Sequence, residues 1–346
     1  MGKCIVVVDF GHGKTKISAY EKEGNKKVLT TGAIIESIDM EIDSPELLQN
    51  ISSFLLQMRA GAGDMVLILP DSCEGVVSTI AEYPLGTSKE VDGMIKNNLT
   101  SLVENNTDKY YCSWRHIRNN GDGLGEFQIA AVKKSFMESM QDIADKHKLN
   151  LVSADLASNA IEGLARAVQN DEKYGPKNDK SAVAIVDVGY KSVRVVIFTK
   201  DSILKTKSFN HDLYRTDKLI YDTLGDLKQD KNVVPEYLKM NPSFTSKIMQ
   251  YPNFLQTVCS DLIMQIKRSV SEGNNYKLAN IYFTGGMYKM PQLVSTIKDS
   301  FGVPCYAFPI EDFVEITHGC ILRENHKPYP SEDVFTASLG AIYGGF

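Results

Sequence analysis

The stretch VAIVDVGYKSVRVVIF, residues 183–198, has a close counterpart near the start of the chain, IVVVDFGHGKTKISAY, residues 5–20. In both, four apolar residues precede an aspartate, a glycine follows two positions later, and apolar and polar residues then alternate. This order predicts a buried strand, a tight turn and a second strand, which together form a β-hairpin. The repeat predicts a chain built from two similar halves.

The tips of the two hairpins carry Asp9 with Gly11 and Asp187 with Gly189. A glycine-rich turn offers backbone N–H groups to an anion, and an aspartate beside it can hold a hydrated Mg²⁺. Two such tips that face each other would hold a polyphosphate from both sides. The alternative is that aspartate and glycine only form ordinary turns. The duplication at a spacing of 178 residues (187 minus 9) favours the phosphate site.

Length and composition limit the class of protein. A chain of 346 residues with 43% hydrophobic content is long enough for two cores. A net charge of −5 without a run of Lys or Arg argues against nucleic-acid binding. The six scattered cysteines contain no CxxC pair, which is typical of reduced thiols in a cytosolic protein. No apolar run reaches the roughly 18 residues of a membrane span, so we expect membrane contact only through a partner.

Strands and helices are predicted along the rest of the chain from apolar spacing. Residues 87–154 are predicted to form a helix–strand–strand–helix–strand unit, which indicates a small inserted α+β subdomain. The predicted strands are 27–38, 64–70, 110–117, 126–132, 149–152 and 279–283, and the predicted helices include 44–58, 158–170, 254–272, 290–301 and 335–343.

Two of these helices carry small residues on one stripe, Ala160 and Gly163 in the first and Gly340 and Gly344 in the second. Small side chains let two helices approach closely, as at a hinge between lobes, although small residues are also common in helices generally.

The strand 279–283 runs into Thr284-Gly285-Gly286, a junction where the absence of side chains lets a nucleotide contact the backbone. There is no GxxxxGK[ST] or GxGxxG between a strand and a helix, which argues against a P-loop enzyme or a Rossmann dehydrogenase.

The order of these features resembles the actin-like ATPase superfamily, and within it the PilM family of type IV pilus assembly proteins, related to the cell-division protein FtsA. The similarity is carried by VLILP before Asp71, STIAEYP ending at Pro84, DLASNAIEGLARAV from Asp155 and YFTGGMYKMPQL from Tyr282. It implies an α/β, actin-like (ribonuclease H-like), duplicated two-lobe ATPase fold with an inserted 1C-type α+β subdomain. The implied divisions are 1–86 for the first part of lobe one (1A), 87–154 for the 1C-like insert, 155–180 for a connecting helix and loop of 1A, 181–210 and 275–332 for lobe two (2A), 211–274 for subdomain 2B and 333–346 for the C-terminal connecting helix of 1A.

The resemblance also implies a site for ATP and Mg²⁺, the metal being held through water by Asp9 and Asp187. The implied nucleotide- and phosphate-binding residues are Asp9, Gly11, His12, Gly13, Lys14, Asp187, Gly189, Tyr190, Lys191, Ser192, Lys267, Thr284, Gly285, Gly286 and Met287.

The chain departs from the family pattern at its turns. His12-Gly13-Lys14 replaces a serine-rich loop, Tyr190-Lys191 replaces small residues, and Asn210-His211 replaces a Gly-Gly pair. Lys14 and Lys191 would neutralise phosphate charge, whereas Tyr190 would crowd the γ-phosphate. We therefore expect ATP to bind and hydrolysis to be slow or absent.

The function implied is that of a cytoplasmic scaffold at the inner face of the membrane, which docks the cytoplasmic peptide of a PilN-like membrane protein and links it to the assembly motor. We expect the peptide to bind near the groove between 1A and the insert, with Tyr111 and Trp114 as contacts. The alternative is that Trp114 only packs within the insert.

Two other functions stay open, that of an FtsA-like division protein and that of a small-molecule kinase of the same superfamily. A kinase needs a catalytic carboxylate, for which Asp155 is the candidate, with a role at the helix start as its alternative. Self-association also stays open.

Overall fold

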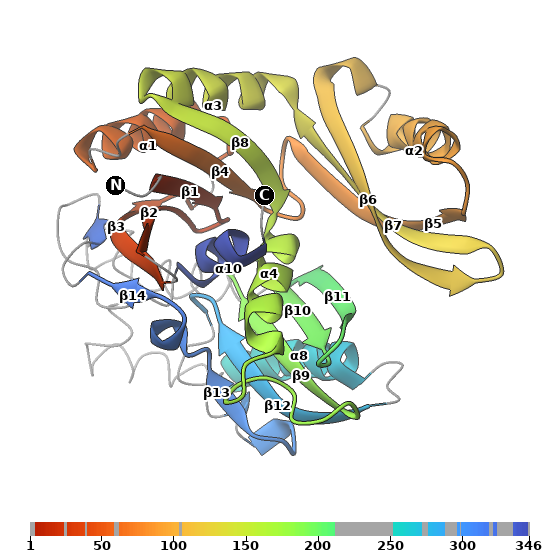
Figure 1. Ribbon diagram of the computed structural model, residues 1–346. Helices are drawn as coiled ribbons and strands as arrows, with labels where there is room; N and C mark the ends of the chain where they lie inside the picture. Colours follow the sequence, from red (N-terminus) through yellow and green to blue (C-terminus); the bar gives the residue numbers. More distant parts are fainter. Residues whose placement is uncertain are drawn as a thin grey trace.

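The structure is a computed structural model of the chain. It describes residues 4–23, 26–38, 40–58, 62–103, 106–211, 252–271, 276–287, 296–297, 299–317, 321–323 and 335–344. Two lobes, each built on a twisted sheet, lie on either side of a pair of helices, and a smaller insert stands to one side (Figure 1). The predicted strands 27–38 and 64–70 and the capped helix 44–58 are confirmed. The helix predicted at 290–301 and most of the region assigned to 2B lie largely outside the described residues.

Lobe one contains a sheet in the order β14-β3-β2-β1-β4-β8, with β15 also paired to β3. Its strands β1 and β2 form the first predicted hairpin, with Asp9 opposite Lys16. Helix α1 begins behind Ser44, whose side chain accepts a hydrogen bond from the Leu47 amide. The elements are β1 (Cys4–Phe10), β2 (Lys14–Glu23), β3 (Lys26–Glu36), α1 (Pro45–Gln57), β4 (Gly63–Leu69), α3 (Lys134–Lys146), β8 (Leu149–Leu156), β14 (Glu315–Ile316) and β15 (Ile321–Arg323).

Lobe two contains a sheet in the order β11-β10-β9-β12-β13. The second predicted hairpin forms as β9 and β10, with Asp187 opposite Arg194. Helix α8 packs its apolar residues, among them Leu262 and Ile266, on this sheet. It therefore belongs to lobe two and not to the predicted subdomain at 211–274. The elements are β9 (Ser181–Val188), β10 (Ser192–Phe198), β11 (Ile203–Asn210), α8 (Pro252–Ser271), β12 (Lys277–Thr284), β13 (Cys305–Ala307) and a short turn of 3₁₀ helix at Ile310–Asp312.

The insert has different boundaries from those predicted. It is a three-stranded sheet in the order β5-β7-β6, covered on one face by α2. The sequence assigns β5 to lobe one, whereas in the structure it pairs with β7 of the insert. The sequence also assigns α3 and β8 to the insert. In the structure both belong to lobe one, because Phe136 of α3 packs on Phe10 of β1 and β8 pairs with β4. The elements of the insert are β5 (Val76–Pro84), α2 (Ser88–Leu102, capped by Thr87), a 3₁₀ turn (Thr107–Lys109), β6 (Tyr110–Gly121) and β7 (Leu124–Lys133).

Helices α4 (Ala157–Gln169) and α10 (Thr336–Gly344) cross between the lobes (Figure 1). A Cβ added to Gly163 would lie 2.1 Å from the carbonyl oxygen of Gly340, and one added to Gly340 would lie 2.0 Å from that of Ala160. These backbones touch only because the side chains are absent. The predicted close crossing of the two helices is confirmed.

Candidate functional site

The two hairpin tips and the turn after β12 meet at one place between the lobes. A Cβ on Gly13 of the first tip would lie 2.8 Å from Cγ of Tyr190 in the second, so the tyrosine ring lies against the first tip. The amide of Met287 donates to the carbonyl of Val188 at 3.0 Å, which holds the turn after β12 against the second hairpin. The structure therefore brings the three predicted nucleotide-binding segments together.

Each hairpin aspartate is paired with a cation that was not among the predicted site residues. Lys16 Nζ lies 2.6 Å from Asp9 Oδ2, and Arg194 Nη1 lies 2.7 Å from Asp187 Oδ2. Each cation stands directly across the hairpin from its aspartate. A signal was present in the sequence, because both cations follow their aspartate by seven residues (16 minus 9, 194 minus 187).

Asp71, which follows β4, ties the second hairpin to lobe one. Its Oδ2 accepts from Arg194 Nε at 2.6 Å and from Ser208 Oγ at 3.1 Å, and its Oδ1 accepts from the amide of Ser158 at the start of α4, also at 3.1 Å. Burial alone would raise the pKa of Asp71, but Arg194 and the hydrogen bonds outweigh it and hold that pKa below its usual value. This buried cluster joins both lobes and the connecting helix.

The remaining residues of the first tip are held by contacts with lobe one. His12 Nε2 lies 3.0 Å from the carbonyl oxygen of Ser72. Burial lowers the pKa of His12, and the charges of Arg194 and Lys191 lower it further, so the imidazole is neutral at pH 7. Lys14 Nζ forms an ion pair with Glu36 at 3.2 Å. The first tip therefore presents a neutral ring beside the basic residues of the second.

The second tip is closed by backbone contacts. The Gly189 amide donates to the carbonyl of Ser192 at 2.9 Å, and His211 Nε2 lies 3.0 Å from the carbonyl oxygen of Gly189. Thr284, the last residue of β12 before this turn, donates its hydroxyl to Thr336 of α10 at 2.7 Å. The turn is thus fixed both to the second hairpin and to a connecting helix.

At Asp187, the place of a hydrated Mg²⁺ held by both aspartates is contested by Arg194 and crowded by the Gly285 turn. One carboxylate oxygen binds Arg194, and the other, Oδ1, lies only 2.5 Å from where a Cβ of Gly285 would be. Gly285 has a positive φ of 90°, which brings its backbone this close. Within the described residues there is also no group of three or more His, Cys, Asp or Glu side chains arranged to hold a metal.

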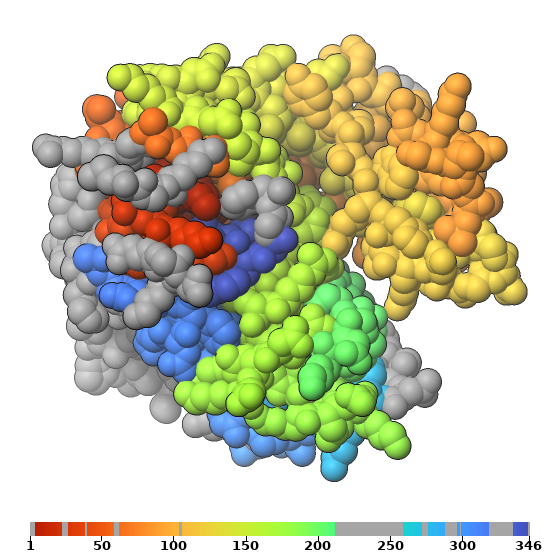
Figure 2. Space-filling view, viewed as in Figure 1, coloured from red at the N-terminus to blue at the C-terminus, as the bar shows by residue number. Residues whose placement is uncertain are grey.

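A second site, a groove of about 390 Å³, lies between lobe one and the insert. One side is β8, the edge strand of the lobe-one sheet, and the other is the face of the insert sheet that α2 does not cover. Figure 2 shows the insert standing out from the two lobes. Its apolar lining includes Leu69, Val76, Ala130, Val132, Met137 and Ala160, and its polar lining includes Ser113, Arg115, Gln128, Asp155, Asn159 and Glu162.

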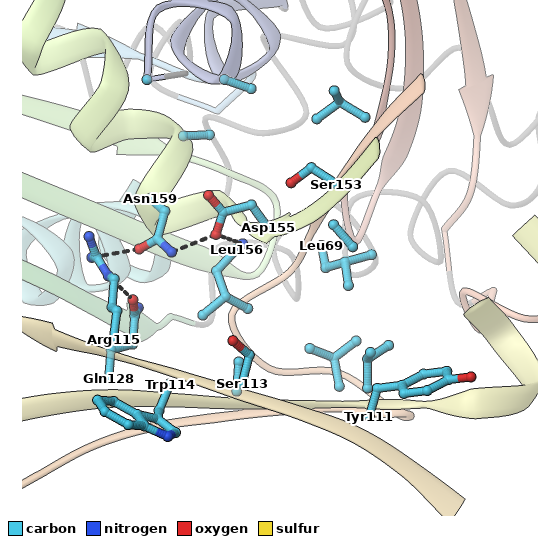
Figure 3. A pocket seen from close by; sticks show the side chains of 18 of the residues that line it. Leu69, Tyr111, Ser113, Trp114, Arg115, Gln128, Ser153, Asp155, Leu156 and Asn159 are labelled. Carbon is cyan, nitrogen blue, oxygen red and sulfur yellow. Dashed lines mark hydrogen bonds between the residues drawn. The ribbon is translucent and has the colours of Figure 1, made fainter. Parts of the chain in front are cut away.

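The polar end of the groove is organised by Arg115 of β6. Its two Nη atoms each donate to Glu162 of α4 at 2.8 Å, Nη2 also donates to Asn159 at 2.7 Å, and Nε donates to Gln128 at 2.6 Å. Such a bidentate pair has a fixed geometry. Because Arg115 is on the insert and Glu162 is on the connecting helix, this pair fixes the insert to the lobes. Figure 3 shows the bonds from Arg115 to Asn159 and Gln128.

Four predicted residues outside the hairpins and the turn after β12 take different positions, and they are Asp155, Trp114, Tyr111 and Lys267. Asp155 lies in the groove, where its Oδ1 accepts from the Leu156 amide and from Asn159 Nδ2. Trp114 also lines the groove, but its indole N–H donates to Asp92 at 2.6 Å, its ring packs on Phe127, and it points away from Asn159 in Figure 3.

Tyr111 is the most exposed aromatic residue of the groove, with 51% of its surface accessible. Lys267 is exposed on α8, and its ammonium lies 5.8 Å from the ring centre of Phe301. That contact is not with either hairpin.

Two similar lobes that each start with an Asp-Gly hairpin, joined by crossing helices, define an actin-like ATPase fold. The family model for the type IV pilus assembly protein PilM matches residues 8–328, and the chain belongs to this family. Both the fold and the family predicted from the sequence are confirmed.

Among solved structures, the chain is similar to the "PilM-PilN type IV pilus biogenesis complex", with a TM-score of 0.69 and 17% identity, covering 99% of this chain and 98% of that one. It is also similar to the ethanolamine utilization protein EutJ from Carboxydothermus hydrogenoformans, with a TM-score of 0.53 and 13% identity, covering 100% of this chain and 91% of that one. No curated protein matches the chain. In the part of the chain that the structure describes, no helix is long and apolar enough to cross a membrane.

Proposed function

We propose that this protein is a cytoplasmic scaffold of the type IV pilus assembly machinery. It docks an extended cytoplasmic segment of a PilN-type membrane protein in the groove, links it to the assembly motor, and binds an adenine nucleotide at the hairpins with little or no turnover. Family membership supports the pilus role, and the likeness to a PilM-PilN complex supports the choice of partner. The observation that carries the proposal is the groove between β8 and the insert.

The groove suits an extended segment because one of its walls is the edge of a sheet. Strand β8 pairs with β4 on one side only among the described strands, and Ala154 on it is exposed. An edge strand offers backbone N–H and C=O groups that an incoming strand can pair with, and neighbouring pockets then select alternate side chains. The apolar lining around Leu69 and Met137 provides such a pocket.

The polar end of the groove favours a hydrogen-bond donor on the partner. Burial raises the pKa of Asp155, although its hydrogen bonds with Asn159 and Leu156 act against that. Both of those bonds use Oδ1, and Oδ2 accepts no hydrogen bond from the residues that the structure describes. Arg115 is already satisfied by Glu162, Asn159 and Gln128. An amide or ammonium group of the docked segment would therefore bind Asp155.

Slow or absent hydrolysis follows from what surrounds the hairpin tips. Tyr190 lies against Gly13, where the first tip would approach a terminal phosphate. His12 donates from Nε2 to the Ser72 carbonyl, and Asp71 accepts from Arg194, so neither side chain is free to act as a general base. Asp155, the candidate for a kinase, lies in the groove. These observations favour a scaffold over a phosphotransferase.

The test is titration of the full chain with a synthetic peptide of the cytoplasmic tail of the PilN-type protein from the same organism. Calorimetry gives the affinity, and amide hydrogen exchange locates the contact, with protection expected along residues 150–156. Ser113→Trp would fill the groove from β6 and is expected to weaken binding at least about tenfold. Asn119→Trp, further along the same strand and outside the groove lining, is the matched control. Equal affinity of the two variants, or protection confined to the hairpin tips, would show that the peptide docks elsewhere.

A further inference from the structure

The pairing of Asp187 with Arg194 has a consequence for how a nucleotide binds. We propose that Arg194 takes the place of a divalent cation at Asp187, so that this chain binds the phosphates of an adenine nucleotide without needing Mg²⁺. The inference rests on the proposed nucleotide binding and adds to it the source of the positive charge.

The first support is the way in which the guanidinium is held. Arg194 is 7% exposed, and it donates from Nη1 to Asp187 and from Nε to Asp71, at 2.7 and 2.6 Å. Charge-assisted bonds from a planar guanidinium to two carboxylates fix both its position and its orientation. The group is therefore a permanent part of the second hairpin, in the way that a bound ion would be.

The second support is that the carboxylate of Asp187 is already engaged and crowded. Oδ2 accepts from Arg194, and the Gly285 turn packs so closely on Oδ1 that a Cβ on Gly285 would lie 2.5 Å from it. A divalent cation here would also lie next to the fixed positive charge of Arg194, and like charges repel strongly where solvent is excluded. Asp9 has the same arrangement in the first hairpin, with Lys16 at 2.6 Å.

The third support is that part of the guanidinium remains available to an anion. Within the described residues, Nη2 of Arg194 makes no hydrogen bond, while Nη1 lies 3.7 Å from where a Cβ of Gly189 would be, at the second tip. The charge of Arg194 also acts on His12 at the first tip. The guanidinium thus lies where both tips meet, which is where the phosphates of a nucleotide would lie.

The test compares ATP and ADP binding to the full chain by calorimetry in buffer with excess Mg²⁺ and in buffer with EDTA. The expected result is the same Kd in both, within about threefold. Binding that is tighter by about tenfold or more with Mg²⁺ would overturn the inference and leave nucleotide binding intact. Binding in neither buffer would overturn the nucleotide part of the proposed function, and this inference with it.

A variant separates the role of Arg194 from that of the other cations. Arg194→Ser is expected to lose affinity in EDTA by about tenfold or more and to recover part of it with Mg²⁺, because Asp187 is then free to bind a hydrated metal. Arg118→Ser, which removes an exposed arginine that donates to the Leu204 carbonyl, is the control and should bind as the wild type does. Nucleotide affinity of Arg194→Ser equal to that of the wild type in EDTA would contradict the inference. If Arg194→Ser does not fold, the comparison of the wild-type Kd in Mg²⁺ and in EDTA still decides whether the inference holds.

Discussion

Replacing Asp71 by asparagine tests whether the buried cluster holds the two lobes together. Asparagine keeps the shape of the side chain and can still accept from the Ser158 amide at the start of α4. It loses the charge that pairs with Arg194, although Asp187 still neutralises part of that guanidinium. Removing one member of a buried ion pair costs about 3–5 kcal/mol, and the remaining carboxylate places this case near the lower value. We expect a loss of about 3 kcal/mol in the free energy of unfolding at pH 7.

The same variant has a predicted pH dependence. The pKa of Asp71 in the folded protein lies below its unfolded value, so its contribution to stability is present above the unfolded pKa and is lost as pH falls through the folded pKa. The unfolded value is about 3.9. The stability difference between the wild type and Asp71→Asn should therefore be constant above about pH 5 and shrink as the pH falls below about 4.

Urea unfolding followed by circular dichroism measures both effects. Asp201→Asn is the matched control, because Asp201 is exposed and such a change alters stability by no more than about 0.5 kcal/mol. If Asp71→Asn and Asp201→Asn unfold at the same urea concentration at pH 7, the cluster does not contribute as argued. A difference that grows on acidification would contradict the sign of the pKa shift.

Two further predictions concern the helix crossing and catalysis. Gly340→Ala should destabilise the protein by about 1–3 kcal/mol, because its Cβ would lie 2.0 Å from the Ala160 carbonyl oxygen. Gly93→Ala, in α2 with nothing within 4 Å of its added Cβ, should stabilise by about 0.5–1 kcal/mol, and thermal unfolding that gives both the same sign would contradict this. Phosphate release from ATP should stay below about 1 s⁻¹, and turnover in the ordinary enzyme range of about 1–10³ s⁻¹ would contradict the scaffold role.

The sequence predicts the hairpins, the crossing helices and the fold because these features are local. Strand alternation and the repeated aspartate are visible within sixteen residues, and the small-residue stripes identify α4 and α10 as helices that approach closely. The division between lobe one and the insert was wrong because the pattern of β5 does not say which sheet it joins. Only the pairing of Val76 with Val132 settles that.

The contacts that organise the two sites were missed for different reasons. Lys16 and Arg194 could be found by comparing the two hairpins, since each follows its aspartate at the same spacing. Asp71 could not, because it meets Arg194 only when β4 and β10 come together from 123 residues apart. The pair of Arg115 with Glu162 likewise depends on how the insert packs on α4. Pairings between lobes need the assembled fold.

Glu162 of α4 links the groove to lobe two. It is 5% exposed, it accepts from Arg115 of the groove, and it accepts from Thr206 Oγ1 of β11 at 2.6 Å. Strand β11 pairs with β10, which carries Arg194 at the hairpin site. A segment bound at Asp155 would act on Asn159, which bonds both Asp155 and Arg115. Through Arg115 it would change the bond that Thr206 donates to Glu162, and so the two sites share a contact.

Binding at one site should therefore alter affinity at the other, and by the same factor in both directions. Couplings of this kind are typically about 1–3 kcal/mol, so we expect the docking peptide to change nucleotide affinity by about fivefold or more, and the nucleotide to change peptide affinity equally. Thr206→Val removes the hydroxyl while leaving the groove and the hairpin tips in place. Each ligand alone should bind this variant within about twofold of the wild type, a difference of well under 1.4 kcal/mol, and the mutual effect should disappear. Calorimetry with each ligand in the presence and absence of the other measures all four affinities. A coupling that persists in Thr206→Val would show that it passes through other contacts between the lobes, and no coupling in the wild type would show that the groove and the hairpins act independently.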